Sequence, residues 1–100
     1  MHPIWLARLD KARPVLILTR EEVREARSLV TVAPITSTVR GLSSEVAVGS
    51  RNGLDHDSAI NLDLITTIPR ANLVRPIGML FDDQEQDLAR AFHSAFDLAD

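Results

Sequence analysis

The sequence predicts a mainly β fold with one packed helix, namely a small β-barrel or curled antiparallel sheet that carries a C-terminal amphipathic helix. Short runs rich in Val, Ile, Leu and Thr recur along residues 1–80, with turn residues between them. Residues 82–98 instead place apolar side chains at helical spacing. Because 100 residues suit one modest core, residues 1–100 are interpreted as a single domain.

The first half of the chain predicts three strands. Residues 3–7 are expected to open the sheet, with Trp5 as a large apolar side chain, and a polar connection at 8–12 follows. Arg13 and Pro14 begin the second strand, where a strand tolerates proline. Residues 19–27 are mostly charged and predict a surface loop with about one or two helical turns. Residues 29–35 are almost all apolar, which predicts a third strand buried on both faces.

The second half continues with shorter strands. A turn at 37–44 leads to an alternating fourth strand at 45–48, and Asn52-Gly53 marks a turn within 49–57. Residues 58–63 predict a fifth strand, which 64–68 either extend or follow with a sixth, and Pro69 is expected to end it. Residues 73–80 mix apolar side chains with Pro76 and Gly78, so their pattern is ambiguous.

The C-terminal segment gives the clearest helical pattern. Asp82 is predicted as the N-cap, with Glu85 three positions later as in a capping box. The acidic residues at 82–87 match the electropositive N-terminal end of a helix. A single apolar stripe is expected to bury against the sheet: Leu88, Ala91, Phe92, Ala95 and Phe96.

Composition narrows the functional classes. The chain has no cysteine, which excludes disulfides and thiolate metal sites, and no apolar run long enough to span a bilayer. Its first residues lack the pattern of a signal peptide, so a cytoplasmic protein without a membrane partner is expected. The net charge of −3 is uneven, since residues 1–51 hold eight basic and five acidic side chains and residues 52–100 hold three and nine. The basic half would attract nucleic acid, although on charge alone a merely solvated surface is the more common explanation.

Polar side chains lie at one end of each of the two most apolar runs. Arg13 precedes the run that begins at Pro14, and Thr36, Ser37 and Thr38 close the run that begins at Val32. If these strands pair, a guanidinium and several hydroxyls converge at one sheet edge, where the guanidinium fork suits a phosphate. The alternatives are a surface ion pair of Arg13 with Asp10 or Glu45, and an ordinary threonine at a strand end.

The order of these motifs resembles the MazF/PemK family of toxin endoribonucleases. The resemblance is carried by Trp5, Arg13-Pro14 before an apolar strand, the segments at 32–36 and 57–60, and Ile77-Gly78 before the helix. It implies an SH3-like barrel, a homodimer, and cleavage of single-stranded RNA without a metal or other cofactor. It also implies a 2′,3′-cyclic phosphate and a 5′-hydroxyl as products, and a cognate MazE-like antitoxin that blocks the RNA groove.

The resemblance assigns roles to individual residues. The family's catalytic arginine falls on Arg13 and its catalytic threonine on Thr36, while the candidates for further RNA contacts are Lys11, Ser37, Thr38 and Arg40. What removes the 2′-proton is not evident, since threonine is a poor base and arginine stays protonated. His56 between two aspartates is a rival general base, although a solvated turn histidine is the more common case.

Two other functions remain open at this point. One is a non-catalytic toxin of related fold that poisons DNA gyrase, as the CcdB inhibitors do, and the other is a degenerate nuclease that has lost turnover. Only the nuclease needs both Arg13 and Thr36. The three histidines are scattered and predict no metal site.

Overall fold

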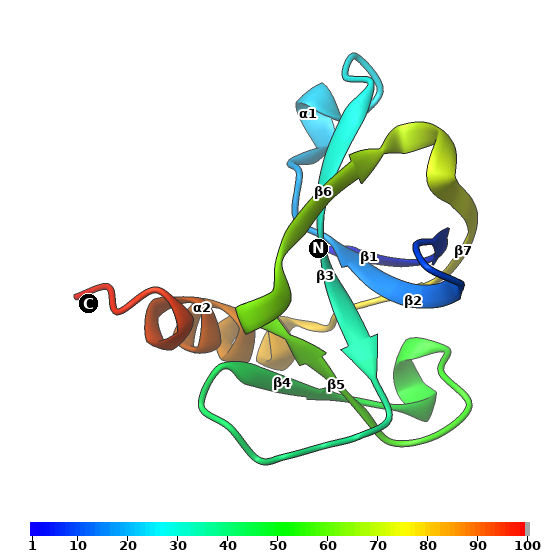
Figure 1. The fold of residues 1–100 in the computed structure, drawn as a ribbon. Coiled ribbons are helices and arrows are strands. Elements are labelled where there is room, and N and C mark those ends of the chain that lie inside the picture. Colours follow the sequence, from blue (N-terminus) through cyan, green and yellow to red (C-terminus); the bar gives the residue numbers. More distant parts are fainter. Residues whose placement is uncertain (100) are drawn as a thin grey trace.

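The computed structural model describes residues 1–99, and the predicted class, a curled antiparallel sheet with a C-terminal helix, is confirmed (Figure 1). Within these residues one sheet has the strand order β4-β5-β3-β2-β1-β7, and β6 also pairs with β3. The strands are β1 (Pro3–Arg8), β2 (Ala12–Ile17), β3 (Leu29–Thr36), β4 (Glu45–Val48), β5 (Ser58–Asn61), β6 (Thr66–Pro69) and β7 (Leu73–Met79). The helices are α1 (Glu21–Arg24) and α2 (Asp82–Ala95), with short 3₁₀ turns η1 (Ser50–Asn52), η2 (Leu62–Leu64) and η3 (Arg70–Asn72).

Strand β3 is the central element, and it lies in the middle of the sheet in Figure 1. Its first half pairs with β6 from Leu29 to Val32, and its last residues pair with β5 at Ile35 and Thr36. On its other side it pairs with β2, with Val15 opposite Pro34. One strand therefore shares its hydrogen bonds among three neighbours, and this bends the sheet into a half-barrel.

Two apolar clusters cover the two faces of the central strands. Successive side chains of a strand alternate between faces. In β3, Ala33 and Ile35 enter the cluster beneath α2, whereas Val30 and Val32 enter a second cluster with Val15. The prediction that this strand is buried on both faces is thereby confirmed.

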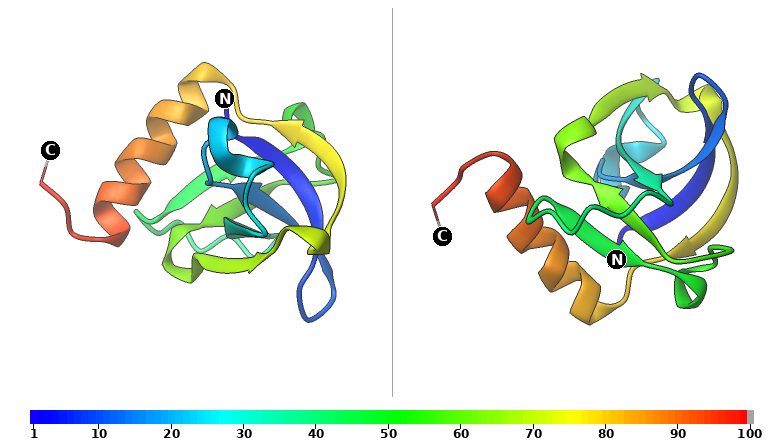
Figure 2. Two further views of the ribbon diagram at one scale, coloured as in Figure 1. Left: turned by 90° about the horizontal axis from the view of Figure 1, so that it is seen from above. Right: turned by 60° about the horizontal axis from the view of Figure 1, so that its bottom comes forward.

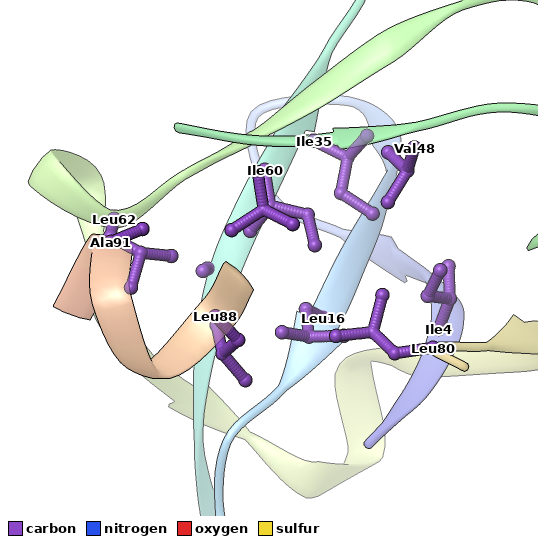
Figure 3. Close-up of a cluster of buried hydrophobic side chains, with 11 residues drawn as sticks. Ile4, Leu16, Ile35, Val48, Ile60, Leu62, Leu80, Leu88 and Ala91 are labelled. Carbon is purple, nitrogen blue, oxygen red and sulfur yellow. The ribbon is translucent and has the colours of Figure 1, made fainter. Parts of the chain in front are cut away.

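Helix α2 covers only part of one sheet face, and the chain beyond it extends away from the sheet (Figure 2). Leu88 and Ala91 are buried in the cluster that also holds Leu62, as Figure 3 shows. The expectation that the whole apolar stripe is buried is wrong. Phe92 is 37% exposed and Phe96 is 49% exposed, and their rings contact each other at 4.8 Å between centroids. The sheet therefore leaves these two rings partly uncovered, although the neighbouring Ala91 and Ala95 pack against the cluster.

The predicted N-cap at Asp82 is also wrong, because Phe81 holds that position and Asp82 is the first helical residue. The Phe81 amide donates to Oε1 of Gln84, at 3.1 Å. Glu85, the expected partner of a capping box, instead accepts hydrogen bonds from the backbone N–H of His2, at 2.8 Å, and lies 2.6 Å from its ring Nδ1. These contacts attach the chain's N-terminus to the helix.

The structure decides two segments that the sequence left open. Most of residues 73–80, ambiguous in sequence, form β7, an edge strand of the kind that tolerates a proline such as Pro76. The segment 58–68 is not one continuous strand, because the turn η2 separates β5 from β6. Pro69 is itself the last residue of β6 and pairs with Leu29.

A buried amide pair joins η1 to the start of α2. Asn52 and Gln84 are 1% and 3% exposed and exchange two side-chain hydrogen bonds of 2.8 and 3.0 Å. Asn52 also donates to the Met79 carbonyl, at 2.9 Å, and Gln84 to the Ala47 carbonyl, at 3.2 Å. These amides are therefore satisfied, whereas a buried polar group without partners costs about 1–3 kcal/mol. The network holds the start of the segment 53–57, which borders the site described below.

No helix in residues 1–99 is both long and apolar enough to cross a membrane.

Candidate active site at the ends of strands β2 and β3

The pairing of β2 with β3 brings Arg13 and Thr36 to the same end of two neighbouring strands. The antiparallel pairing ends at Val15 and Pro34, and its register extended by two residues would set Arg13 opposite Thr36. Because side chains alternate, Arg13 shares a face with Val15, and Thr36 shares a face with Pro34. The two predicted catalytic residues therefore lie at the same edge of the sheet, as the sequence analysis expects.

Two cavities meet at this edge. Cavity A, of about 560 Å³, and cavity B, of about 500 Å³, both have Arg13, Ile35 and Thr36 in their walls. Cavity A adds Leu6, Lys11, Ala12, Pro14, Ser37, Gly53, Leu54, Asp55, His56, Ser58, Arg75 and Ile77. Cavity B adds Leu9, Pro34, Thr38, Arg40, Leu42, Glu45, Asn61, Asp63 and Leu64. A group bound between Arg13 and Thr36 would thus border both cavities.

Arg13 forms the ion pair that was the alternative to a catalytic role. Its Nε and Nη2 atoms donate to the two carboxylate oxygens of Asp10, at 2.9 and 3.2 Å. A guanidinium has five N–H groups, so three remain for a ligand. Since the Arg13 side chain is 37% exposed, the pair leaves it accessible while holding its plane. The ion pair and a ligand role are therefore compatible.

The hydrogen bonds from Arg13 lower the pKa of Asp10 from 3.8 to about 2, with a smaller contribution from the Lys11 amide. The same pair raises the pKa of Arg13. Because the folded pKa of Asp10 lies below its unfolded value, the pair stabilises the fold above about pH 4. This contribution is lost as the pH falls through the folded value near 2.

We expect an NMR titration to give a midpoint near 2 for the Asp10 carboxyl carbon. In Arg13→Ala the midpoint should return towards 3.8, because the main cause of the shift is removed. Asp55, which forms no ion pair with an arginine within residues 1–99, serves as the internal reference. An unchanged Asp10 midpoint in Arg13→Ala would show that the ion pair does not form in solution.

The hydroxyl of Thr36 is oriented by its own chain. Its Oγ1 accepts a hydrogen bond from the backbone N–H of Thr38, at 3.1 Å. With a lone pair occupied by this bond, the O–H hydrogen is free to point elsewhere. Thr36 is therefore set up to donate a hydrogen bond to an oxygen bound beside Arg13.

The four predicted RNA-binding residues divide between the cavities. Lys11 and Ser37 border cavity A, whereas Thr38 and Arg40 border cavity B. The loop that carries three of them is held by Glu45, whose Oε1 accepts three backbone N–H bonds of 2.9 to 3.2 Å from Arg40, Gly41 and Leu42. Glu45 therefore orders this loop rather than pairing with Arg13.

Sequence reasoning missed Arg75, which lies in the acidic half of the chain. Leu6 pairs with Pro14 on one side and with Arg75 on the other, so Arg75 reaches cavity A. No local pattern signals this, since the placement depends on β1 separating β2 from β7. His56 and Asp55 also border cavity A, and His56 is an exposed turn histidine, as the sequence favours.

A further cavity of about 720 Å³ contains Trp5, Arg24 and Arg70 but none of the predicted site residues. Cavity volume alone therefore does not identify this site. Across residues 1–99 no group of three or more His, Cys, Asp or Glu side chains is placed to hold a metal ion.

Comparisons with known proteins agree on one family. Residues 3–96 match the model described as the PemK-like, MazF-like toxin of type II toxin–antitoxin systems. Endoribonuclease MazF3 of Mycobacterium tuberculosis is 57% identical over 98 residues, covering 98% of this chain and 95% of that protein. A solved structure of the M. tuberculosis toxin MazF-mt6 is 57% identical, with a TM-score of 0.94 over 97% of this chain and 98% of that one. A mycobacterial endoribonuclease solved with its cognate antitoxin has the same fold, with a TM-score of 0.86 at 22% identity, over 97% of this chain and 93% of that one.

Proposed function

This chain belongs to the PemK-like, MazF-like toxin family of type II toxin–antitoxin systems, and on that basis we propose that it is an endoribonuclease. Its substrate is single-stranded RNA, cut at a short sequence without a metal ion. The products are a 2′,3′-cyclic phosphate and a 5′-hydroxyl. The full-length relationship to MazF3, named an endoribonuclease, supports this reaction over gyrase poisoning.

The observation that carries the proposal is the placement of Arg13 and Thr36 in the shared wall of two cavities. Cleavage of this type needs the 2′-oxygen to attack the adjacent phosphorus in line with the departing 5′-oxygen. Negative charge builds on the non-bridging oxygens as the bond forms. A guanidinium held beside them stabilises the transition state more than the ground state.

Thr36 adds a directed hydrogen bond. Because its oxygen accepts from the Thr38 amide, the hydroxyl can donate to a non-bridging phosphate oxygen. Arg13 and Thr36 together hold the phosphate from two strands, which fixes the geometry needed for in-line attack. Cavities A and B then receive the nucleotides on the two sides, with Lys11, Ser37, Thr38 and Arg40 as their polar contacts.

The decisive test is to incubate the purified protein with single-stranded RNA in EDTA and to identify the new ends. We expect cyclic phosphate and 5′-hydroxyl termini at a recurring short sequence. Ends that carry a 5′-phosphate, or cleavage that requires added metal, would contradict the mechanism. Intact RNA together with arrested DNA gyrase would contradict the nuclease itself.

Thr36→Ala should lower the cleavage rate about tenfold to a hundredfold, because one hydrogen bond to a charged oxygen contributes about 1.5–3 kcal/mol. Thr36→Ser keeps the hydroxyl and should retain most of the activity. Single-turnover rates and thermal unfolding of both variants provide the measurement. If Thr36→Ala unfolds at the assay temperature, or if Ser and Ala lose activity equally, the hydroxyl does not have this role.

Family membership also supports proposals about assembly. We place the protein in the cytoplasm, where cellular RNA is found, and expect residues 1–100 to act as one toxin domain. A cognate MazE-like antitoxin neutralises it by blocking the RNA groove, and the toxin forms a homodimer. The mycobacterial relative solved with its antitoxin supports the first of these partners through its shared fold.

A further inference from the structure

We propose that His56 is the general acid of the RNA cleavage reaction, donating the proton that the leaving 5′-oxygen requires. This inference rests on the proposed nuclease function and names a group that neither Arg13 nor Thr36 can replace. It starts from the finding that His56 borders the same cavity as both residues.

The geometry of in-line attack separates the two proton transfers. The attacking 2′-oxygen and the leaving 5′-oxygen occupy opposite apices about phosphorus. Arg13 and Thr36 line both cavities, so a phosphate held by these two residues borders cavity A and cavity B. The proposal assigns the leaving oxygen to cavity A, which contains His56, and the attacking oxygen to cavity B.

The side chains of the two cavities differ in what they can do with a proton. Cavity B contains the carboxylates of Glu45 and Asp63, which are ordinarily ionised near neutral pH and can accept a proton but not supply one. Cavity A contains one carboxylate, that of Asp55, and three cations that bind their protons too tightly to release them, namely Lys11, Arg13 and Arg75. The proton donor is therefore expected in cavity A, from a side chain of intermediate acidity.

His56 is the side chain of cavity A that meets this requirement. Imidazole ordinarily changes its charge between pH 5 and 8, so it can both carry and release a proton at physiological pH. The hydroxyls of Thr36, Ser37 and Ser58 are far weaker acids.

The backbone of His56 is held while its ring is available. Ser58 Oγ donates to the His56 carbonyl, at 3.0 Å, and the segment begins at Gly53, whose φ of +87° is a left-handed turn conformation. Asn52, at the start of the turn, is tied into the buried amide pair with Gln84. The His56 side chain is exposed and makes no hydrogen bond or ion pair within residues 1–99. The ring is therefore free to face a nucleotide in cavity A.

Cleavage with His56 as the general acid removes one proton from the 2′-oxygen and delivers one proton to the 5′-oxygen. The 2′-oxygen forms a bond to phosphorus while its proton passes to a carboxylate or water on the cavity B side. The bond from phosphorus to the 5′-oxygen breaks, its electron pair stays on that oxygen, and the imidazolium of His56 supplies the proton. The products are the cyclic phosphate, the 5′-hydroxyl and a neutral imidazole, which regains a proton from solvent.

The test uses a leaving group that needs no proton. Once the cleavage site is known, two RNA oligonucleotides are made that differ only in a bridging sulfur in place of the scissile 5′-oxygen. A thiolate is a far better leaving group than an alkoxide because a thiol is much more acidic. We expect His56→Gln to slow single-turnover cleavage of the oxygen substrate about a hundredfold, as removal of a general acid does. It should cleave the sulfur substrate at close to the parent rate.

Control variants separate a loss of proton donation from a loss of phosphate binding or of folded structure. Arg13→Ala should lose activity on both substrates, because phosphate charge develops in either reaction. His93→Gln, a histidine change on α2 away from both cavities, should behave as the parent. Equal losses of His56→Gln on both substrates would make His56 a binding or structural residue, and no loss on the oxygen substrate would remove it from the reaction. A parent protein that cleaves neither substrate would instead overturn the proposed nuclease function.

Discussion

Arg13→Ala is expected to lower the rate of RNA cleavage by about a hundredfold or more. Removing one preorganised donor from a site of developing negative charge costs about 3 kcal/mol of transition-state stabilisation. Arg13 borders both cavities, whereas Lys11 and Arg75 border only cavity A and Arg40 borders only cavity B, so we expect none of these cations to replace it. Single-turnover kinetics with saturating protein measures the effect directly.

The stability of this variant should change little, since the ion pair with Asp10 is solvent-exposed. Arg13→Lys is the matched control, because it keeps the charge and loses the planar fork. We expect it to be slower than the parent and faster than Arg13→Ala. A variant without Arg13 that cleaves at the parent rate would exclude the guanidinium from the reaction.

Gly78→Ala is expected to destabilise the fold by about 3 kcal/mol or more, which is at the upper end of overpacking effects. A Cβ atom at residue 78 would overlap the carbonyl oxygen of Asn52. That carbonyl cannot move freely, because the Asn52 side chain is held by Gln84 and by the Met79 carbonyl. Urea unfolding, followed by the fluorescence of Trp5, measures the loss.

Gly41→Ala is the matched control for this substitution. Gly41 has a positive φ of +72°, but no atom lies within 4 Å of where its Cβ would stand. Its cost should therefore be only the backbone strain of about 1 kcal/mol. Equal stability losses at residues 41 and 78 would show that the close approach of Gly78 to Asn52 does not exist in solution.

The strands show why most of the fold could be predicted. Their apolar, β-branched runs and the turn at Asn52-Gly53 are local signals, and 3–7, 29–35 and 45–48 match β1, β3 and β4 closely. The predictions are wrong at positions whose structure depends on contacts with residues distant in the sequence. Phe81 takes the N-cap position predicted for Asp82, and its backbone N–H donates to Gln84, whose side chain is held by Asn52. Phe92 and Phe96 follow the helical period, yet the sheet leaves their rings partly uncovered.

The candidate site likewise contains some residues that the sequence predicts and others that only the tertiary structure reveals. Arg13 and Thr36 were predicted because each stands at the end of a recognisable strand, and both border cavities A and B. Arg75 was missed because no sequence neighbour marks it. It reaches cavity A only through the pairing of β1 with β7.

By itself, the sequence determined the β-rich class, the position of the C-terminal helix and the two residues expected to hold the phosphate, because periodicity and strand-end chemistry are carried by residues close together in the chain. Only the tertiary structure decided that Arg13 and Thr36 form the common wall of two cavities, and that His56, Asp55 and Arg75 complete one of them. The physical reason is strand order. Which side chains share a cavity depends on which strands lie side by side, and β3 takes three partners from widely separated parts of the chain.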